Sequence, residues 1–233
     1  EVTDHPFLGS YVWAMEAAPN GDLWVGGLLG GDPLVSGTGV APWTEPPVLA
    51  RFDGEGWTVY DSPPYDPTWG CYNALLDLAV GPDGVVWWAS GSGLVSFDGT
   101  EWTTHIDGWR VGSVDVAPDG TVWYADDYGI HAADFPAVVA APGPADYGGV
   151  LAVSAREMWA VMGDLLCRLQ LGLPRECYTL TGYGWVAGLA VTPDGTVWAA
   201  TNSGVFSFDG GVWTRRLDSW AGGVAVAPDG AVL

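Results

Sequence analysis

Short runs of alternating apolar and polar residues recur along the chain, and each run ends at a turn that contains glycine. The residues six and four positions before this glycine are apolar in every copy, as Val114 and Val116 are before Gly120. An alternation with period two is typical of β-strands. No segment shows the sustained three-to-four-residue periodicity of a helix. The pattern therefore predicts an all-β protein made of many short strands.

The turn motif repeats about every 36 residues. Five copies share a turn glycine with a bulky residue three positions later: APNGDLW (18–24), GPDGVVW (81–87), APDGTVW (117–123), TPDGTVW (192–198) and APDGAVL (227–233). A sixth, weaker copy without the glycine is SAREMW (154–159). A second turn motif follows in three copies: RFDGEGWT (51–58), SFDGTEWT (96–103) and SFDGGVWT (207–214). Two hairpins per repeat predict four antiparallel strands, here named A to D, with Trp on strands B and D.

Four-stranded repeats in series are typical of the blades of a β-propeller. We predict one propeller domain over residues 1–233, and its expected parts are blades at about 11–61, 73–107, 111–142, 148–181 and 185–218, a partial blade at 221–233 and an insertion at 26–47. Residues 1–4 align with the end of strand D in other repeats. We therefore expect six blades, with the chain continuing past Leu233 and the N-terminal strand closing the ring. A larger ring is the alternative.

Two segments carry a family resemblance. VAPDGTVWYADDYGI (116–130) and VTPDGTVWAATNSGVFSFDG (191–210) resemble the two-component-regulator propeller repeats and, more loosely, the virginiamycin B lyase-like propellers. The first resemblance implies a ligand-sensing module outside the cytoplasm, and the second implies a lyase that uses His and acidic residues. Propellers host many unrelated activities, so the resemblance specifies the fold more closely than the function.

The charge and hydropathy of the chain exclude some classes of binding partner. It has 28 acidic and 7 basic residues and a formal net charge of −21, a balance that repels the phosphates of DNA and RNA. No run of 18 apolar residues is present, so we expect no direct membrane insertion. The expected partner is a small-molecule or glycan ligand, or a protein. The expected location is extracellular or periplasmic.

One end of the predicted blades holds the candidate ligand site. In an up-and-down blade the B–C loops and the D-to-A crossings share an end, and here that end carries the insertion 26–47 and the long crossing 61–73. Aromatic faces beside polar groups suit sugars and organic cations. We predict that the ligand-binding residues are Trp69, Tyr72, Asp107, Trp109, Arg110, Tyr147, Tyr183, Trp185 and Trp220. The alternative is that these rings fill the mouth of the central channel.

Residues for catalysis or metal binding are sparse. His5, His105 and His131 fall in different repeats without ligand spacing, and no Ser-His-Asp set can be assembled from the sequence. We therefore predict no catalytic residues, no metal and no cofactor. Glu16, Asp77 and Asp115 share the polar side of strand A in three successive repeats. For this group we expect hydrogen bonds to neighbouring backbone, with a bound cation or buried water as the alternative.

Two of the three cysteines are placed symmetrically about a turn. Cys167 and Cys177 each lie five residues from Gly172, so they face each other across the predicted C–D hairpin and are expected to form a disulfide. Two free thiols are the alternative. Cys71 is then free or intermolecular. A disulfide would favour an oxidising compartment.

These observations favour a non-catalytic recognition module that senses or binds a glycan or another small molecule. A protein-interaction or structural scaffold that uses the insertion 26–47 is the first alternative. A lyase or hydrolase at the channel mouth is the second.

Overall fold

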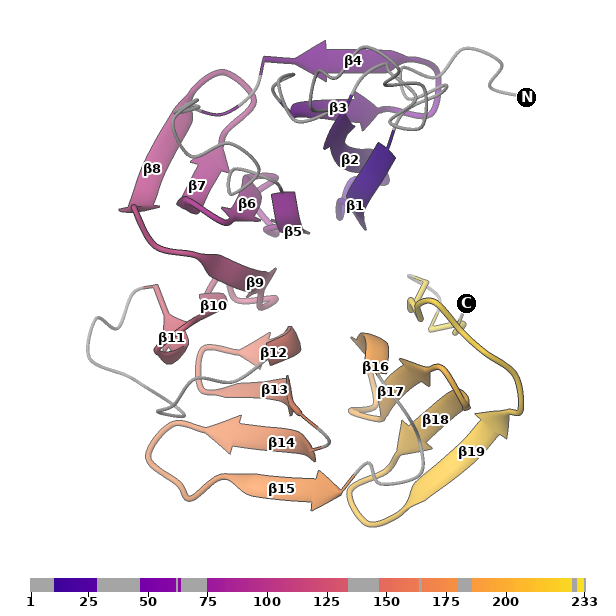
Figure 1. Ribbon diagram of the computed structural model, residues 1–233. Coiled ribbons are helices and arrows are strands. Elements are labelled where there is room, and N and C mark those ends of the chain that lie inside the picture. Colours follow the sequence, from indigo (N-terminus) through magenta and orange to yellow (C-terminus); the bar gives the residue numbers. More distant parts are fainter. Residues whose placement is uncertain are drawn as a thin grey trace, which may run out of the picture. The chain divides into compact units, whose positions relative to one another are not determined.

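The computed structural model describes residues 11–28, 47–61, 63, 75–133, 147–163, 165–179, 186–227 and 230–232. Every regular element within these residues is a β-strand (Figure 1). None of these residues belongs to a helix that could cross a membrane.

The strands form five antiparallel sheets, each built from strands that are consecutive in the chain. Sheet 1 contains β1 (Tyr11–Ala17), β2 (Leu23–Leu28), β3 (Val48–Phe52) and β4 (Trp57–Tyr60). Sheet 2 contains β5 (Leu75–Val80), β6 (Val86–Ser90), β7 (Gly93–Phe97) and β8 (Trp102–Asp107). Sheet 3 contains β9 (Val111–Val116), β10 (Val122–Asp126) and β11 (Gly129–Ala132).

The last two sheets follow the same order. Sheet 4 contains β12 (Tyr147–Ser154), β13 (Glu157–Met162), β14 (Leu165–Gln170) and β15 (Glu176–Thr179). Sheet 5 contains β16 (Val186–Val191), β17 (Val197–Thr201), β18 (Gly204–Phe208) and β19 (Trp213–Leu217). After β19, an isolated bridge pairs Val226 with Val232.

These sheets confirm the predicted fold, an all-β propeller of four-stranded antiparallel blades with part of a sixth. Sheet 3 has three strands among the described residues, and the segment 134–146, where its fourth strand was expected, lies outside them. Most of the predicted insertion, residues 29–46, also lies outside them. The chain divides into two compact units, Glu1–Val116 and Ala117–Leu233.

The Asp-Gly turns form for local reasons. In the β9–β10 turn, the N–H of Ala117 donates to the carbonyl oxygen of Thr121 at 2.8 Å, and Gly120 has a φ of 88°, a conformation that favours glycine. The carboxylate of Asp119 accepts the N–H of Thr121 at 3.0 Å. The amide hydrogen bonds of this carboxylate, above all one from Ala155, lower the pKa of Asp119. Its charge thus stabilises the turn.

Tryptophans on the second strands pack against the next sheet. Trp24 of β2 stacks on Tyr60 with ring centroids 5.4 Å apart, and it meets Phe97 of sheet 2 at 6.4 Å. Trp159 of β13 meets Phe208 of sheet 5 at 5.6 Å. The predicted packing of these rings between adjacent blades is therefore confirmed in both units.

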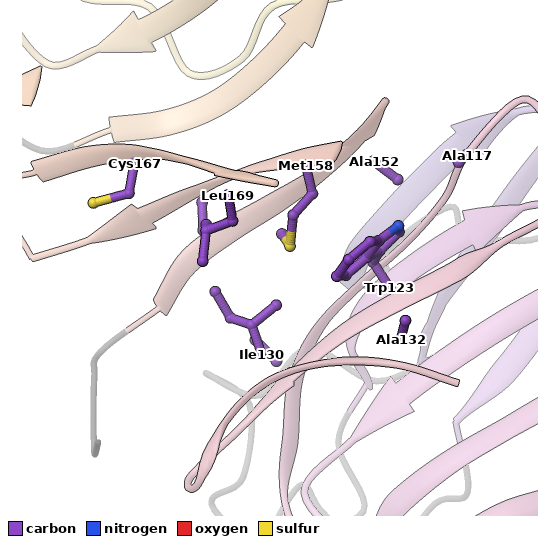
Figure 2. Packing of buried hydrophobic residues seen from close by; sticks show 10 residues of the cluster. Ala117, Trp123, Ile130, Ala132, Ala152, Met158, Cys167 and Leu169 are labelled. Carbon is purple, nitrogen blue, oxygen red and sulfur yellow. The ribbon is translucent and has the colours of Figure 1, made fainter. Parts of the chain in front are cut away.

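Trp123 of β10 is the most completely buried of these rings. Its exposed fraction is 0%, and it lies in one cluster with Ile130 of its own sheet and with Met158 and Leu169 of sheet 4 (Figure 2). Its indole N–H donates to the carbonyl oxygen of Ser154 at 2.9 Å. The ring therefore fills the space between two sheets and also satisfies its polar atom there.

Trp87 and Trp198 also lie three residues after a turn glycine, but they are only half-buried. In sheet 2 the neighbouring Trp88 is the buried ring, with an exposed fraction of 1%, and it packs toward sheet 1. After sheet 5, the described residues form only the bridge between Val226 and Val232. The Trp at this position of the repeat is therefore buried in sheets 1, 3 and 4 and half-buried in sheets 2 and 5.

We predict that Trp123→Ala will lower the free energy of unfolding by about 3–5 kcal/mol, because it removes a large buried ring and leaves a cavity. Trp109→Ala is the matched control, because this indole is 54% exposed and its loss should cost less than about 1 kcal/mol. Chemical denaturation of both variants measures the difference. Equal losses would contradict this assignment of core and surface tryptophans.

Candidate functional site

The candidate site lies at the end of the sheets that carries the B–C turns and the D-to-A crossings, here called the crossing face. In sheets 2 and 5 this face includes the B–C turns 91–92 and 202–203 and the crossings 108–110 and 218–221. The Asp-Gly hairpins occupy the opposite end. The antiparallel strand order confirms this separation within each unit.

Two tryptophans of the crossing face are exposed. Trp109 follows β8 and is 54% exposed, and Trp220 follows β19 and is 69% exposed. Each comes seven residues after the Trp that begins its outer strand and two residues after an aspartate. The two crossings therefore present an indole at equivalent positions in sheets 2 and 5. Whether these rings bind a ligand stays a prediction.

The crossing after β8 is held against the B–C turn of its own sheet. Asp107 pairs with Gly93 in the sheet register, and the N–H of Gly108 donates to the carbonyl oxygen of Ser92 at 2.9 Å. A Cβ atom at Gly93 would collide with the carbonyl oxygen of Ile106. The close approach requires glycine at that position, and it places Asp107 and Trp109 next to the turn.

The crossing after β19 begins with the same close backbone approach, and its carboxylate forms an ion pair. A Cβ atom at Gly204 would collide with the carbonyl oxygen of Leu217, which matches the arrangement in sheet 2. Here Arg215 forms an ion pair with Asp218 at 2.5 Å, and its guanidinium lies 5.6 Å from the centre of the Phe206 ring. In sheet 2 the arginine instead follows the tryptophan of the crossing. This residue, Arg110, comes directly after Trp109, is exposed and lies beside Gly112.

The other predicted ligand residues are less well placed. Tyr147 begins β12 and pairs with Met162. Trp69, Tyr72, Tyr183 and Trp185 lie outside the described residues. Asp107, Trp109 and Arg110 fall together in the first unit, whereas Trp220 belongs to the second.

Tyr128 is a further exposed aromatic of the crossing face that was not predicted from the sequence. This side chain is 61% exposed in the B–C turn of sheet 3, at the position that Ser92 and Ser203 occupy in sheets 2 and 5. The Asp126 carboxylate accepts the N–H of Tyr128 at 2.8 Å and that of Gly129 at 2.9 Å, which shapes the turn. A signal was available, because an aromatic replaces a small residue at a repeated turn position.

The acidic group of the inner strands lies within the first unit. The Asp77 carboxylate accepts the hydroxyl of Ser113 at 2.5 Å and the N–H groups of Val114 and Leu78 at 3.1 and 3.0 Å. The Asp115 carboxylate accepts the N–H of Val116 at 2.7 Å. The expected hydrogen bonds to backbone are therefore confirmed for both aspartates. Among the described residues no set of three His, Cys, Asp or Glu side chains has the geometry of a metal site.

The charges of this group oppose one another. Burial raises the pKa of Asp77 in spite of its three hydrogen bonds. Glu16 reaches solvent at its surface, but the protein around it removes much of its hydration. This desolvation, followed by the charges of Asp115 and Asp77, raises the pKa of Glu16 to about 8. At neutral pH the Glu16 carboxyl therefore holds a proton.

A serine and a histidine are hydrogen-bonded in sheet 2. The hydroxyl of Ser96 and the Nε2 atom of His105 are 2.8 Å apart, the His105 ring lies 4.5 Å from the ring of Trp87, and burial lowers the pKa of His105. This geometry resembles a nucleophile beside a base.

Sheet 5 shows that the pair is a packing unit. Ser207 and Trp198 stand at the equivalent positions, and Arg216 replaces the histidine, with its Nε donating to the Ser207 hydroxyl at 2.8 Å and its guanidinium 5.8 Å from the centre of the Trp198 ring. An arginine cannot serve as a general base at this position because it stays protonated. The repeated feature is the contact with tryptophan, so we interpret Ser96 and His105 as structural.

Cys167 and Cys177 are directly opposed in the β14–β15 pair, and their sulfur atoms are bonded at 2.10 Å. The structure therefore contains the disulfide that their equal distances from Gly172 indicate. Cys71 lies outside the described residues.

Comparison with known proteins identifies the fold. No protein-family model matches the chain. No curated protein matches its sequence either. Virginiamycin B lyase from Staphylococcus aureus, solved as an inactive variant with quinupristin, is similar in structure, with a TM-score of 0.64 and 12% identity over 97% of this chain and 77% of that one. Identity this low shows a shared fold alone.

An extracellular domain and a surface component share the fold. The extracellular domain of a putative hybrid two-component system from B. thetaiotaomicron has a TM-score of 0.65 and 14% identity over 99% of this chain. PorZ, a surface component of the type-IX secretion system of Porphyromonas gingivalis, has a TM-score of 0.61 and 15% identity over 98% of this chain. This chain spans 33% of the first and 39% of the second.

We predict that the free energy of unfolding will fall as pH rises from about 4.5 to about 8, because the folded chain keeps the proton of Glu16 in this range whereas the unfolded chain has released it. Glu16→Gln removes this titration, so its free energy of unfolding should depend less on pH. Denaturation curves at several pH values measure both slopes.

Asp194→Asn is the matched control, because the pKa of Asp194 is shifted in the opposite direction to that of Glu16. A hydrogen bond from the Thr192 hydroxyl and another from the N–H of Thr196 lower the pKa of Asp194. Its charge therefore stabilises the fold above the ordinary aspartate pKa and loses this effect in acid. The variant should be less stable than the unmodified chain at neutral pH. A Glu16→Gln slope identical to that of the unmodified chain would contradict the assignment.

Proposed function

We propose that this chain is a non-catalytic recognition module that binds a glycan or another small polar molecule at its crossing face. Trp109, Asp107 and Arg110 form one contact region, and Trp220 forms a second. Tyr128 is a further aromatic of this face. We also propose that the module works in an extracellular or periplasmic compartment.

The observation that carries the proposal is the exposure of two indoles at equivalent crossings. Burying a tryptophan stabilises a protein, and the repeat tryptophans Trp24, Trp123 and Trp159 are buried between sheets. Trp109 and Trp220 instead present most of their surface to solvent. An exposed aromatic surface of this kind is available for contact with a ligand.

The residues around Trp109 supply the polar part of such a contact. Asp107 accepts hydrogen bonds, and Arg110 donates them one residue after the indole. A pyranose ring presents C–H groups to an aromatic face and hydroxyls to polar groups at its rim. An indole flanked by an acceptor and a donor therefore suits a sugar better than a purely apolar ligand.

The structural neighbours and the disulfide support the proposed location. The neighbours from B. thetaiotaomicron and P. gingivalis are an extracellular domain and a surface component. The Cys167–Cys177 bond is consistent with an oxidising compartment.

A second candidate is a lyase, because virginiamycin B lyase shares the fold. The Ser96–His105 pair does not favour it, since sheet 5 repeats the same packing with arginine. Screening for lyase and hydrolase activity, with a chelator control, separates an enzyme from a binder. A protein partner is the outcome to expect if no small ligand binds and a partner contacts the crossing face.

We predict that Trp109→Ala and Trp220→Ala will each weaken ligand binding by at least about 1 kcal/mol, because aromatic anchors carry a large share of binding energy. A glycan array identifies the ligand, and calorimetry with the strongest-binding glycan measures the affinities. Denaturation should show little change in either variant.

Leu173→Ala is the control for this prediction. Leu173 is also well exposed, at 62%, but it lies in the C–D hairpin of sheet 4 at the opposite end. Its substitution should leave the affinity unchanged. If the ligand maps to the Asp-Gly hairpins and both tryptophan variants bind normally, the proposed site is wrong.

A further inference from the structure

Three sheets hold their outermost strand with the same pair of aromatic rings. The first residue of that strand is Trp, and it lies against the Phe that ends the third strand. The centroid distances are 5.2 Å for Phe52–Trp57, 4.7 Å for Phe97–Trp102 and 5.1 Å for Phe208–Trp213. This contact is a repeated clamp on the edge of the sheet.

The same three sheets also close the C–D turn with an aspartate. Asp98 accepts the N–H groups of Thr100 and Glu101, each at 2.8 Å. Asp53 and Asp209 make the equivalent pairs of hydrogen bonds in sheets 1 and 5. Each outer strand is therefore held by two non-covalent devices, one at its first residue and one in its turn.

Sheet 4 has neither device. Its C–D turn, residues 171–175, reads LGLPR and contains no aspartate, and β15 reads ECYT and contains no tryptophan. The disulfide between Cys167 and Cys177 joins the two strands at the point where they pair. A covalent bond thus replaces the aromatic pair and the aspartate turn in this sheet.

Few side chains of the strand β15 are buried. Tyr178 is half-buried, and the other three residues are exposed. The Tyr178 ring lies 5.9 Å from Trp159 of its own sheet and 4.4 Å from Phe208 of sheet 5. Through this one side chain, β15 contributes to the contact between sheets 4 and 5.

The rest of sheet 4 is held independently of β15. The Arg168 guanidinium donates two hydrogen bonds to the Glu157 carboxylate at 2.8 and 2.9 Å, and Gln170 donates a third at 2.8 Å. These bonds join β14 to β13, which also pair along six residues. Detachment of β15 would therefore leave the first three strands in place.

We propose that the Cys167–Cys177 disulfide is a redox-controlled clamp that determines whether β15 stays paired and Tyr178 stays packed against sheet 5. Cys167 is buried and Cys177 is exposed, so an external dithiol meets Cys177 first. This accessibility makes the clamp reversible in the folded chain.

The exchange uses one dithiol. A thiolate of the dithiol attacks Sγ of Cys177, a mixed disulfide forms, and Cys167 leaves as a thiolate that takes up a proton. In the mixed disulfide, the first sulfur of the dithiol is bonded to Sγ of Cys177. The second thiol of the dithiol, as its thiolate, attacks that first sulfur, and Cys177 leaves as a thiolate that takes up a proton. The dithiol is oxidised by two electrons to its disulfide, and the two cysteines are reduced to thiols.

Hydrogen exchange with mass spectrometry tests the clamp in the Cys71→Ala chain, with and without dithiothreitol at neutral pH. Alkylation and intact mass report whether the bond has been reduced. We expect amide exchange at residues 176–179 to become at least about tenfold faster on reduction, because the bond closes a loop of sequence separation 10 whose closure entropy then has to be overcome. Exchange in β8 and β19, which carry the aromatic pair, should stay unchanged.

A Cys167→Val, Cys177→Val variant is the second measurement. It should show the fast exchange at 176–179 without dithiothreitol and no response to it. Three results would overturn the proposal: a disulfide that resists reduction in the folded chain, unchanged exchange at β15 after reduction, or accelerated exchange throughout sheets 4 and 5. The last result would mean that the bond supports the whole fold instead of one strand.

Discussion

The packing of tryptophan between neighbouring sheets is the interaction on which the remainder of this structure depends. A four-stranded sheet has two faces, and a small sheet cannot bury both without a neighbour. The second strands of three sheets offer a large ring to the sheet that follows, as Trp24 does to sheet 2, Trp123 to sheet 4 and Trp159 to sheet 5. Where the next sheet covers the ring, as at Trp123, the ring is fully buried. The sheets therefore stabilise one another in series.

This constraint also separates scaffold from candidate site. Tryptophans that follow the turn glycines at the repeated offset pack within the fold. Polar side chains pack beside them, as His105 does against Trp87 while it is hydrogen-bonded to Ser96. Trp109 and Trp220 lie in the crossings between sheets, at equivalent positions after β8 and β19, and remain exposed. The crossing face thus carries exposed aromatic surface.

The acidic character of the chain has two different origins in the structure. Turn aspartates such as Asp98 accept backbone N–H groups at the surface, and these bonds lower the pKa of Asp98. Glu16 and Asp77 lie on inner strands, where desolvation raises their pKa values. The charge of the first group stabilises hairpins, whereas burial works against the charge of the second group.

The sequence by itself determined the strands, the hairpins, the propeller fold and the pairing of Cys167 with Cys177. These features depend on periods of two residues, on turn chemistry and on a repeat of about 36 residues, all of which act over short distances along the chain. The same information indicated the crossing face, because strand order decides which loops share an end. It also contained the signal for Tyr128, a ring at a turn position that other repeats fill with serine.

Only the tertiary structure decided which residues at equivalent positions are buried. Trp87 and Trp123 share one offset, yet one is half-buried and the other is 0% exposed, because burial depends on which side chains surround each ring in space. The same reason explains Glu16, whose raised pKa comes from surrounding protein and from carboxylates 61 and 99 residues away in the chain. It also explains Tyr178, which packs on Phe208 of the following sheet. Burial and electrostatics are sums over neighbours in space, and one repeat of a sequence does not contain those neighbours.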